Sequence, residues 1–290
     1  MFKRIAIFGP GLLGGSICKK LKMIDPGVDI TAYARDAARL APALRGGHVD
    51  AVKGYESISL AGVDLAVVAT PVDISIEILR KILEHPELKS DAIVIDVGSV
   101  KERVLESVAD CARAGQFVGC HPMAGSEKMG FEFSEAELYA GATVIVTPHG
   151  GNDESTVRTV RNFWEWLGAQ TVIATPRDHD IIIAQTSHLP HLMACSLMKV
   201  FSEFERRREH TNDIRPFIGK GFLDVTRISS GSPDMWRDIT LLNRENILGA
   251  LSRMIEELVH LKEIVSASDQ RSREIHDYFA GAKKIRDLIS

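Results

Sequence analysis

Two polar segments carry side chains that could together move a proton. Ser99 lies in the segment Asp96–Lys101, directly after a short apolar run, and His121 opens the segment His121–Gly130 after a second such run. An imidazole with a hydroxyl neighbour can form a proton-accepting pair. We therefore expect His121 to act as a base and Ser99 to lie beside it.

Both residues also have ordinary structural interpretations. Ser99 and Glu102 have the spacing of a capping box, which would open a helix predicted over residues 100–114. His121 could be a hydrogen-bonded histidine at a strand end, although the glycine-containing polar turn after it favours a site. The two roles of Ser99 are compatible if its hydroxyl also faces the cleft.

A glycine-rich turn near the N-terminus could hold the phosphates of a dinucleotide. Gly9, Gly11 and Gly14 form the pattern G-x-G-x-x-G between a predicted strand and a predicted helix, with Leu12 and Leu13 between the last two glycines. Such glycines permit a tight turn, close approach of a pyrophosphate, and packing of the helix on the strand. The phosphates would bind free N–H groups at the helix N-terminus. A tight turn that binds another ligand is the alternative.

The end of the second predicted strand bears on the choice between NAD and NADP. Ala34 takes the position where NAD-specific domains place an acidic residue, and Arg35 follows it. A small residue followed by arginine suits a 2′-phosphate, so the pattern favours NADP. Alternatively, Asp36 binds the ribose and restores NAD, unless Asp36 is the N-cap of the next helix. Thr70 and Pro71 end the third predicted parallel strand, at the edge that would face the nicotinamide half of the cofactor.

The C-terminal half adds basic candidates. His188 and His191 are three residues apart and would share one face of a predicted helix. No Glu-x-x-His motif or cysteine pair completes a metal site around them, so we expect no metal. Arg227 and Arg237 could grip carboxylates in bidentate fashion, or could form ion pairs with nearby aspartates.

The elements that must position these residues change in kind at Thr175. Before it, near-continuous apolar runs alternate with helical periodicities, which predicts a parallel sheet covered on both faces; after it, the pattern is helical throughout. We therefore expect an α/β fold with a Rossmann-type doubly wound parallel sheet in residues 1–175. An all-helical domain for substrate binding and dimerisation would follow in residues 176–290. The predicted strands are Arg4–Phe8, Val28–Tyr33, Val63–Ala69, Ala92–Val97, Phe117–Cys120, Ala142–Thr147 and Thr171–Ala174, and the predicted helices are Leu12–Met23, Ala37–Leu44, Ile74–Leu83, Val100–Ala114, Glu154–Leu167, Asp178–Glu205, a stretch around Asp224–Ser229, Met235–Leu242, Glu245–Ser268 and Gln270–Ile289.

Composition excludes several other classes of protein. Of the 290 residues 26% are charged, and the net charge is −4, so no basic field recommends nucleic acid or a membrane surface. The apolar runs are far shorter than the roughly 20 residues of a membrane-spanning helix, and the N-terminus lacks a signal-peptide pattern. The four scattered cysteines are typical of a reduced protein. We expect a cytoplasmic protein that dimerises through the wide apolar face of residues 248–265.

Six segments together resemble the prephenate/arogenate dehydrogenase family. They occur in family order over nearly the whole chain, and the combination of His-Pro-Met-Ala-Gly, Ser-His-Leu-Pro-His and Thr-Arg-Ile is highly specific. The resemblance implies oxidative decarboxylation of prephenate to 4-hydroxyphenylpyruvate, with hydride transfer to NAD(P), in tyrosine biosynthesis. The six segments are Gly9–Ser16, Asp96–Lys101, His121–Gly130, Ser187–His191, Gly221–Arg227 and Pro233–Asp238.

The resemblance also implies a role for each matched residue. His121 would accept the proton of the ring hydroxyl, and Ser99 would hydrogen-bond that hydroxyl or His121. Arg227 would bind a substrate carboxylate, and His191 would help to place the substrate's side chain. The other substrate-binding positions are Ser126, His188 and Glu127, the last in a polar gate of the pocket.

Some departures from the family pattern leave alternatives open. The pair Ala34-Arg35 differs from NAD-preferring members, which have aspartate there, and Leu223 stands where many relatives have a basic residue. Arogenate, which carries an ammonium in place of the keto group of prephenate, is the alternative substrate. We expect neither a chorismate mutase segment nor a C-terminal regulatory domain.

Two other functions remain to be distinguished. A β-hydroxyacid dehydrogenase or pyrroline-carboxylate reductase would place its proton donor on the helical domain, whereas His121 lies in the α/β part. A nucleotide-sensing protein would bind the cofactor without turnover, which the joint presence of His121, Ser99 and Arg227 disfavours.

Overall fold

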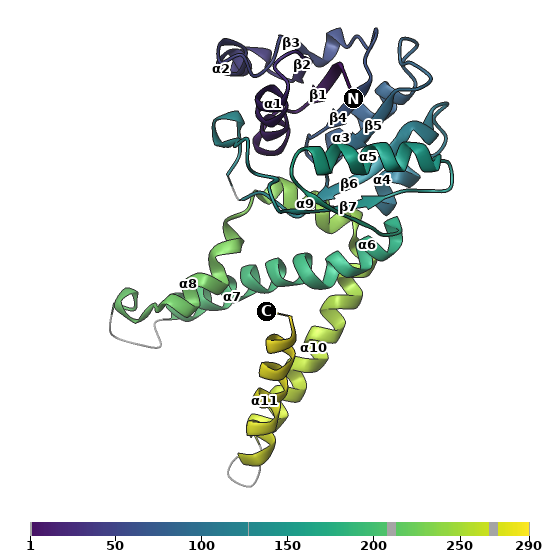
Figure 1. Cartoon of the computed structure of the whole chain (residues 1–290). Helices are drawn as coiled ribbons and strands as arrows, with labels where there is room; N and C mark the ends of the chain where they lie inside the picture. The colour runs from purple at the N-terminus through teal and green to yellow at the C-terminus, as the bar shows by residue number, and fades with distance from the viewer. Residues whose placement is uncertain (1, 127, 208–212, 267–271, 290) are drawn as a thin grey trace. The chain divides into compact units, whose positions relative to one another are not determined.

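An eight-stranded sheet is the centre of the first of two compact units. The computed structural model describes residues 2–126, 128–207, 213–266 and 272–289, and the units are residues 1–244 and 245–290. The strand order is β3-β2-β1-β4-β5-β6-β7-β8 (Figure 1). The strands are β1 (Arg4–Phe8), β2 (Asp29–Ala34), β3 (Ala51–Gly54), β4 (Leu65–Val68), β5 (Ile93–Asp96), β6 (Phe117–Pro122), β7 (Thr143–Thr147) and β8 (Gln170–Ile173). The helices of this unit are α1 (Leu12–Ile24), α2 (Ala41–Arg45), α3 (Val72–Leu83), α4 (Glu102–Glu106), α5 (Glu154–Trp166), α6 (Pro176–Ile183), α7 (Leu189–Arg207), α8 (Lys220–Thr226) and α9 (Pro233–Leu242).

Side chains of each central strand alternate between two cores. In β1, Ile5 and Ile7 belong to one core while Ala6 and Phe8 belong to the other, because successive side chains of a strand point to opposite faces. Helices α1 and α5 contribute to the first core, and α3 and α4 to the second. With helices on both faces, β4 and β5 are buried over their whole length. The predicted doubly wound α/β architecture is confirmed.

Two features of the sheet differ from the sequence prediction. The prediction of a wholly parallel sheet is wrong at one point. Strands β6 and β7 are antiparallel, so β7 and β8 run opposite to the strands before them. The second difference is strand β3, which the sequence analysis missed. It has four residues and only Gly54 is fully buried, so it lacks the continuous apolar run by which the other strands were found.

The helix predicted over residues 100–114 is mostly absent. Helix α4 covers only Glu102–Glu106, and from Val108 onward the backbone N–H groups bond three residues back, as in successive turns. The Arg80 guanidinium donates to the Ser107 carbonyl at 2.6 Å and to the Asp110 carboxylate at 2.6 Å. These bonds hold the chain in a non-helical path, which the apolar periodicity alone does not reveal.

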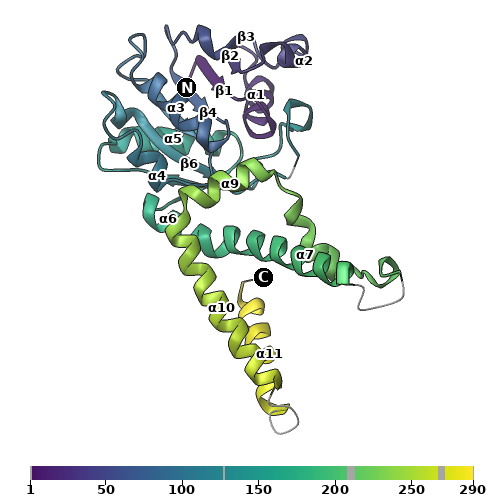
Figure 2. The same cartoon turned by 180° about the vertical axis from the view of Figure 1, so that it is seen from behind.

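One continuous helical run leads away from the sheet (Figures 1 and 2). Helix α6 begins after Thr175, whose hydroxyl accepts from the Asp178 N–H at 3.0 Å. Its buried side chains are His179, Asp180 and Ile183. A π turn over Ala184–His188 then joins α6 to α7, and in it the Leu189 N–H bonds to the Ala184 carbonyl five residues back. The single helix predicted over 178–205 is therefore two α-helices with a π turn between them.

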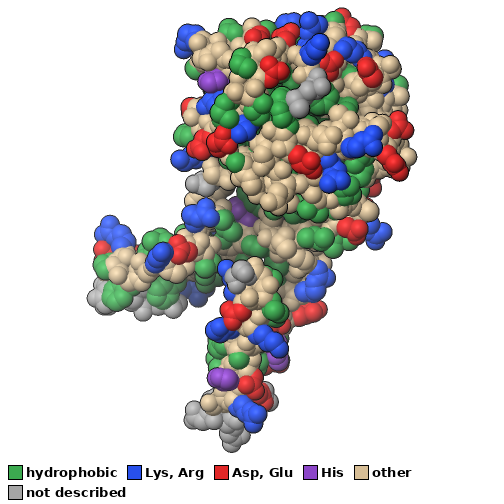
Figure 3. All heavy atoms as spheres, viewed as in Figure 1, with side chains coloured by type: hydrophobic (Ala, Val, Ile, Leu, Met, Phe, Trp, Pro, Cys, Tyr) green, Lys and Arg blue, Asp and Glu red, His purple; other side chains and the backbone are tan. Residues whose placement is uncertain are grey.

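Two long helices form the second unit, α10 (Arg244–Ser266) and α11 (Ser272–Leu288). The two helices predicted here are confirmed, except for the positions within 267–271 that lie outside the described residues. Several large apolar side chains of this unit are exposed: Leu248, Ile255, Leu258, Val259, Val265, Phe279, Ile285 and Leu288. Along the described part of the chain, no helix has the length and apolarity needed to cross a membrane. Figure 3 shows acidic and basic side chains interspersed over the visible face of the first unit.

Candidate active site

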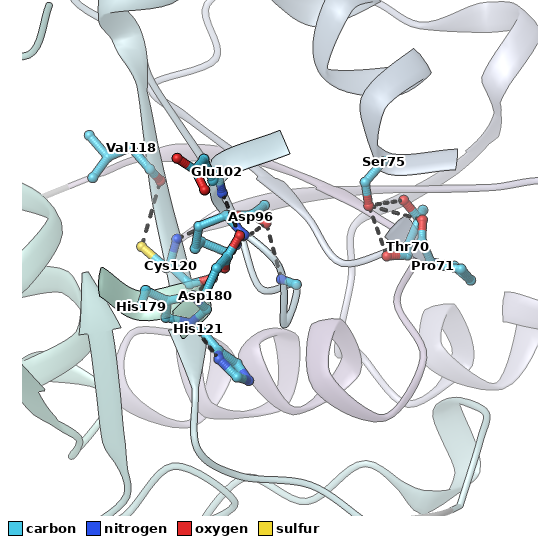
Figure 4. A network of polar contacts seen from close by, with 12 residues as sticks. Thr70, Pro71, Ser75, Asp96, Glu102, Val118, Cys120, His121, His179 and Asp180 are labelled. Carbon is cyan, nitrogen blue, oxygen red and sulfur yellow. Dashed lines mark hydrogen bonds and ion pairs between the residues drawn. The ribbon is translucent and has the colours of Figure 1, made fainter. Parts of the chain in front are cut away.

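A line of three buried or half-buried side chains connects β6 with α6. The His121 imidazole, at the end of β6, has its Nδ1 2.8 Å from Nε2 of His179. Nδ1 of His179 lies 2.7 Å from Oδ1 of Asp180, and both residues are only 1% exposed. Figure 4 shows the three side chains in sequence, joined by these contacts. The predicted base therefore lies at a strand end of the sheet but is held by a helix that begins 55 residues later in the sequence, where no motif pointed to it.

Burial keeps the His121 imidazole neutral. Removal from water lowers the pKa of His121 well below its ordinary value, and nearby His179, Lys101 and His188 lower it further. A neutral imidazole has one nitrogen with a free lone pair. His121 is thus in the protonation state that a proton acceptor needs at neutral pH.

A buried ion pair fixes the segment that carries Ser99. The Lys101 ammonium pairs with the Asp96 carboxylate and also donates to the Cys120 carbonyl at 2.9 Å. The same carboxylate accepts from the N–H groups of Cys120 at 2.9 Å and Gly98 at 3.1 Å. Because Gly98 precedes Ser99 and Cys120 precedes His121, the pair ties together the two segments that the sequence singled out.

The capping-box interpretation of Ser99 is wrong. Helix α4 starts at Glu102 without a hydrogen bond from its own N-cap side chain. The N–H groups of Lys101 and Glu102 instead donate to the carboxylate of Asp180, from α6, at 2.9 Å each. The Ser99 hydroxyl is half-buried and has no hydrogen-bond partner among the residues that the structure describes. That leaves the hydroxyl available for a ligand, which is the other interpretation of this residue.

A second buried histidine lies on the same network. Nδ1 of His188 faces the Asn243 amide nitrogen at 3.2 Å, and that amide also donates to the Asp180 main-chain carbonyl at 2.9 Å. Burial lowers the pKa of His188 to about 4. A neutral ring that accepts at Nδ1 carries its proton on Nε2. Within the described residues Nε2 of His188 is buried without a partner, so the ring offers an unused donor.

The two candidate histidines of the helical run are linked through Trp236. The His191 ring stacks on the Trp236 indole, with centroids 3.4 Å apart, and the His188 ring meets the same indole edge-on at 5.9 Å. Gly231 is required beside them, since a Cβ there would lie 2.6 Å from the indole nitrogen. His188 and His191 therefore lie against the same indole, and His188 is also close enough to His121 to lower its pKa.

The glycine-rich turn has the geometry of a phosphate cradle. Gly9 adopts a φ of 78°, and its carbonyl accepts from the Gly11 N–H at 2.7 Å. A Cβ on Gly14 would lie 2.8 Å from the Gly9 carbonyl oxygen, whereas a Cβ on Gly11 would meet nothing within 4 Å. No side chain caps the N-terminus of α1. The open space at Gly11 and the uncapped first turn of α1, which begins at Leu12 and Leu13, fit a pyrophosphate.

Two neighbouring segments close around this turn. A Cβ on Gly9 would lie 2.6 Å from Thr70 Cγ2, so Thr70 lies against it after the end of β4, and Pro71 follows as the residue before α3. A Cβ on Gly125 would lie 3.5 Å from Leu13, which brings the loop after His121 over the start of α1. Ser126, in this loop, is exposed and accepts from the Lys128 N–H at 3.3 Å. Glu127 lies outside the described residues.

The contacts after the strand end at Ala34 show which role Asp36 has. Oδ1 of Asp36 accepts from the Ala38 N–H at 3.2 Å, and the carboxylate pairs with Arg39 at 3.3 Å. Asp36 is thus the N-cap of the next helical turn. Arg35, directly after Ala34, is exposed.

The two arginines of the helical half differ. Arg237 pairs with Asp238 at 2.7 Å and with Asp234 at 3.1 Å, so the ion-pair interpretation is right for it. Arg227 is exposed and follows α8 at the start of a short 3₁₀ turn over Arg227–Ser230.

Four residues of this network escaped the sequence analysis as candidates, and they are His179, Asp180, Asn243 and Trp236. In the sequence, His179 and Asp180 are marked only by their spacing from Ile183, which places them on the same helix face as an apolar residue. The structure shows that this face is buried. Asn243 and Trp236 gave no signal of their own.

A dinucleotide cradle on a doubly wound sheet, with a neutral histidine beside it, defines a nicotinamide-dependent dehydrogenase with a helical C-terminal part. The family model for the nucleotide-binding domain of prephenate dehydrogenase matches residues 17–173, and the model for its dimerization domain matches residues 175–281. The chain belongs to the prephenate dehydrogenase family, as the six segments predicted, and uses a nicotinamide dinucleotide.

Known proteins of this family are similar over nearly the whole chain. A prephenate dehydrogenase of Bacillus subtilis is 32% identical over 98% of this chain and 75% of its own length. A cyclohexadienyl dehydrogenase of Zymomonas mobilis is 32% identical over 93% of this chain and 90% of its own. The crystal structure of prephenate dehydrogenase from A. aeolicus, in complex with hydroxyphenyl propionate and NAD+, has a TM-score of 0.89 and 32% identity, covering 100% of this chain and 99% of that one.

Proposed function

We propose that this protein oxidises and decarboxylates prephenate to 4-hydroxyphenylpyruvate in tyrosine biosynthesis. The observation that carries the proposal is the position of His121, a neutral imidazole held at the end of β6 beside the loop that covers the dinucleotide turn. It is the acceptor that oxidation of a ring hydroxyl requires, in a chain of the family whose members act on such compounds.

In the proposed mechanism, His121 accepts the proton of the ring hydroxyl at Nε2 as the carbinol carbon is oxidised. Bound nicotinamide supplies the hydride acceptor. Ser99, held by the Asp96–Lys101 pair, orients the hydroxyl or the imidazole. The ring carboxylate then leaves as CO2 because aromatisation drives the bond cleavage, so no side chain has to perform that step. The protein contributes orientation and one base.

The substrate contacts are also proposals. The unpaired Nε2–H of His188 suits a substrate oxygen, because a buried donor without a partner carries a desolvation cost that a ligand oxygen would remove. His191, fixed by stacking on Trp236, would place the substrate's side chain, and Arg227 would bind a carboxylate. Ser126 would contact the substrate from the loop after His121, and Glu127, outside the described residues, stays a candidate on the resemblance alone.

The cofactor preference that we propose is NADP. The support is that the Asp36 carboxylate is already hydrogen-bonded as an N-cap. Arg35 is exposed and would bind the 2′-phosphate of the adenosine ribose. The A. aeolicus structure holds NAD+, so the preference rests on the strand end of this chain alone.

Steady-state rates with NADP and NAD, each with prephenate and arogenate, test substrate and cofactor together. We expect prephenate turnover, with kcat/KM for NADP about tenfold or more above that for NAD. Arg35→Ser should lower kcat/KM with NADP by about 10–100-fold, since a charge-assisted contact is worth about 1.5–3 kcal/mol, and leave NAD nearly unchanged. Equal losses with both cofactors would remove Arg35 from phosphate binding, and turnover of arogenate alone would replace prephenate as the substrate.

The pH profile should reflect the depressed pKa of His121. An ordinary histidine is half protonated near pH 6.5. Burial and the neighbouring His179, Lys101 and His188 lower the pKa of His121. Its base form therefore persists to lower pH, and the acid limb of the kcat/KM profile shifts to lower pH. Initial rates should remain close to their plateau at about pH 6.5. A half-maximal rate at that pH would contradict a buried neutral base.

We further propose a homodimer formed through the C-terminal helices. One support is the set of exposed apolar side chains on α10 and α11. The other is that residues 175–281 match the model for the dimerization domain of prephenate dehydrogenase. Sedimentation analysis that gave only a monomer would exclude it.

A further inference from the structure

We propose that His179 and Asp180 are positioning residues that hold the proton of His121 on Nδ1, so that Nε2 faces the substrate as a free acceptor. The inference deepens the proposed function and rests on His121 being the base. The observation behind it is the unbroken series of facing nitrogen and oxygen atoms from Asp180 through His179 to His121.

The series starts from a group that only accepts. A carboxylate has no proton to give, and the Asp180 carboxylate also accepts from the N–H groups of Lys101 and Glu102, at 2.9 Å each. The atom of His179 that faces it at 2.7 Å, Nδ1, must therefore carry a proton. In a neutral ring the other nitrogen, Nε2, is then an acceptor.

The next contact follows from the same count of protons. Nε2 of His179 lies 2.8 Å from Nδ1 of His121. Two facing nitrogens form a hydrogen bond only if exactly one proton lies between them, so Nδ1 of His121 carries it. The opposite tautomers would place the His179 lone pair against the carboxylate. Nε2 of His121 is therefore the lone pair that remains.

Because the two residues are buried, the proton positions on His179 and His121 are fixed by their partners. His179 and Asp180 are each 1% exposed, so water does not satisfy a misplaced donor or acceptor, and an unmatched pair would destabilise the folded protein. Asp180 is itself held by the first turn of α4 and by its place near the capped start of α6. When His121 takes up the substrate's proton, the resulting imidazolium still donates toward His179 and the carboxylate.

The direct test is the tautomer of His121 in the whole protein. Long-range 1H–15N correlation spectra of protein labelled with 15N-histidine distinguish Nδ1–H from Nε2–H, and the resonance that disappears in His121→Asn identifies His121. We expect Nδ1–H in the unmodified protein. The measurement needs no substrate, so it stands even if prephenate is not turned over. An Nε2–H tautomer in an enzyme that oxidises prephenate would overturn this inference alone.

Asp180→Asn should reverse the series. An amide whose NH2 group takes the place of Oδ1 gives up the bond from the Lys101 N–H and donates to Nδ1 of His179. That moves the His179 proton to Nε2 and the His121 proton to Nε2 as well. We expect the spectrum of His121 to change to Nε2–H, and kcat to fall by about 10²–10⁴-fold, as for a catalytic histidine in the wrong tautomer, with KM for the dinucleotide within about twofold. Asp64→Asn is the matched control, because Asp64 also accepts from two consecutive backbone N–H groups, those of Lys3 and Arg4, at 2.8 and 3.0 Å.

A pair of variants at His179 separates positioning from folding. His179→Gln keeps an acceptor oxygen near the place of Nε2, whereas His179→Leu removes it. We expect the glutamine variant to stay within about tenfold of the parent kcat and the leucine variant to lose about 100-fold or more, both with unchanged dinucleotide binding. A folded His179→Leu enzyme with kcat within about threefold of the parent would overturn the proposal.

Discussion

Replacing His121 with asparagine is expected to lower kcat by about 10²–10⁴-fold, the range of a lost general base. Asparagine keeps an oxygen or nitrogen near the position of Nδ1 and can still contact His179 at the end of β6. It has no group near the position of Nε2, and its amide does not accept a proton at neutral pH. The fold and the dinucleotide turn should therefore persist while the proton transfer fails.

The measurement is kcat with prephenate beside the dissociation constant of the dinucleotide from fluorescence titration. His85→Asn is a suitable control, since His85 lies between α3 and β5 and its ring accepts from the Glu87 N–H at 3.3 Å. Near-normal turnover in His121→Asn would remove this residue from the mechanism. A loss of dinucleotide affinity that matched the loss of kcat would indicate a structural role instead.

Replacing Lys101 with methionine is expected to be the most destabilising of the changes considered. Lys101 and Asp96 are 2% exposed or less. Methionine fills much of the same volume but leaves the Asp96 carboxylate buried without its cation, which costs about 3–5 kcal/mol. The free energy of unfolding in urea should fall by about that amount. Lys81→Met, which breaks the exposed pair with Glu77, should cost less than about 1 kcal/mol.

A second variant checks the reason for this loss. If the uncompensated charge is the cause, adding Asp96→Asn to Lys101→Met should recover part of the lost stability, because the amide is neutral and its oxygen still accepts from the Cys120 N–H. A double variant less stable than the single one, or a single variant that loses under about 1 kcal/mol, would contradict the explanation.

The sequence predicted the elements whose burial is complete. Strands such as β4 and β5 are apolar at every position because helices cover both of their faces, and this produces a signal that one chain carries by itself. Strand β3 lies at the sheet edge and has no such signal. The reversed direction of β7 escaped because an apolar strand has the same composition whichever way it runs.

The site was predictable only where its chemistry is local. The glycine spacing and the motif around His121 are read within a few residues of one another. His179 acts on a residue 58 positions away, and Asp180 on backbone groups 78 and 79 positions away. Such contacts exist only after α6 has packed on β6, so no spacing in the sequence encodes them. The predicted helix over 100–114 failed for the same reason, because the donor that breaks it, Arg80, comes from α3.

The π turn between α6 and α7 determines how far α7 is rotated about its own axis relative to α6. An α-helix rotates by about 100° per residue, so the one extra residue that the turn Ala184–His188 accommodates rotates the whole of α7 about its axis relative to α6 by about that amount. The face of α6 with His179 and Asp180 and the face that carries His188 and His191 share a network because of that rotation. The number of residues in this turn is therefore constrained more tightly than their identity. A deletion there would leave two good helices with the right composition and the histidines out of phase.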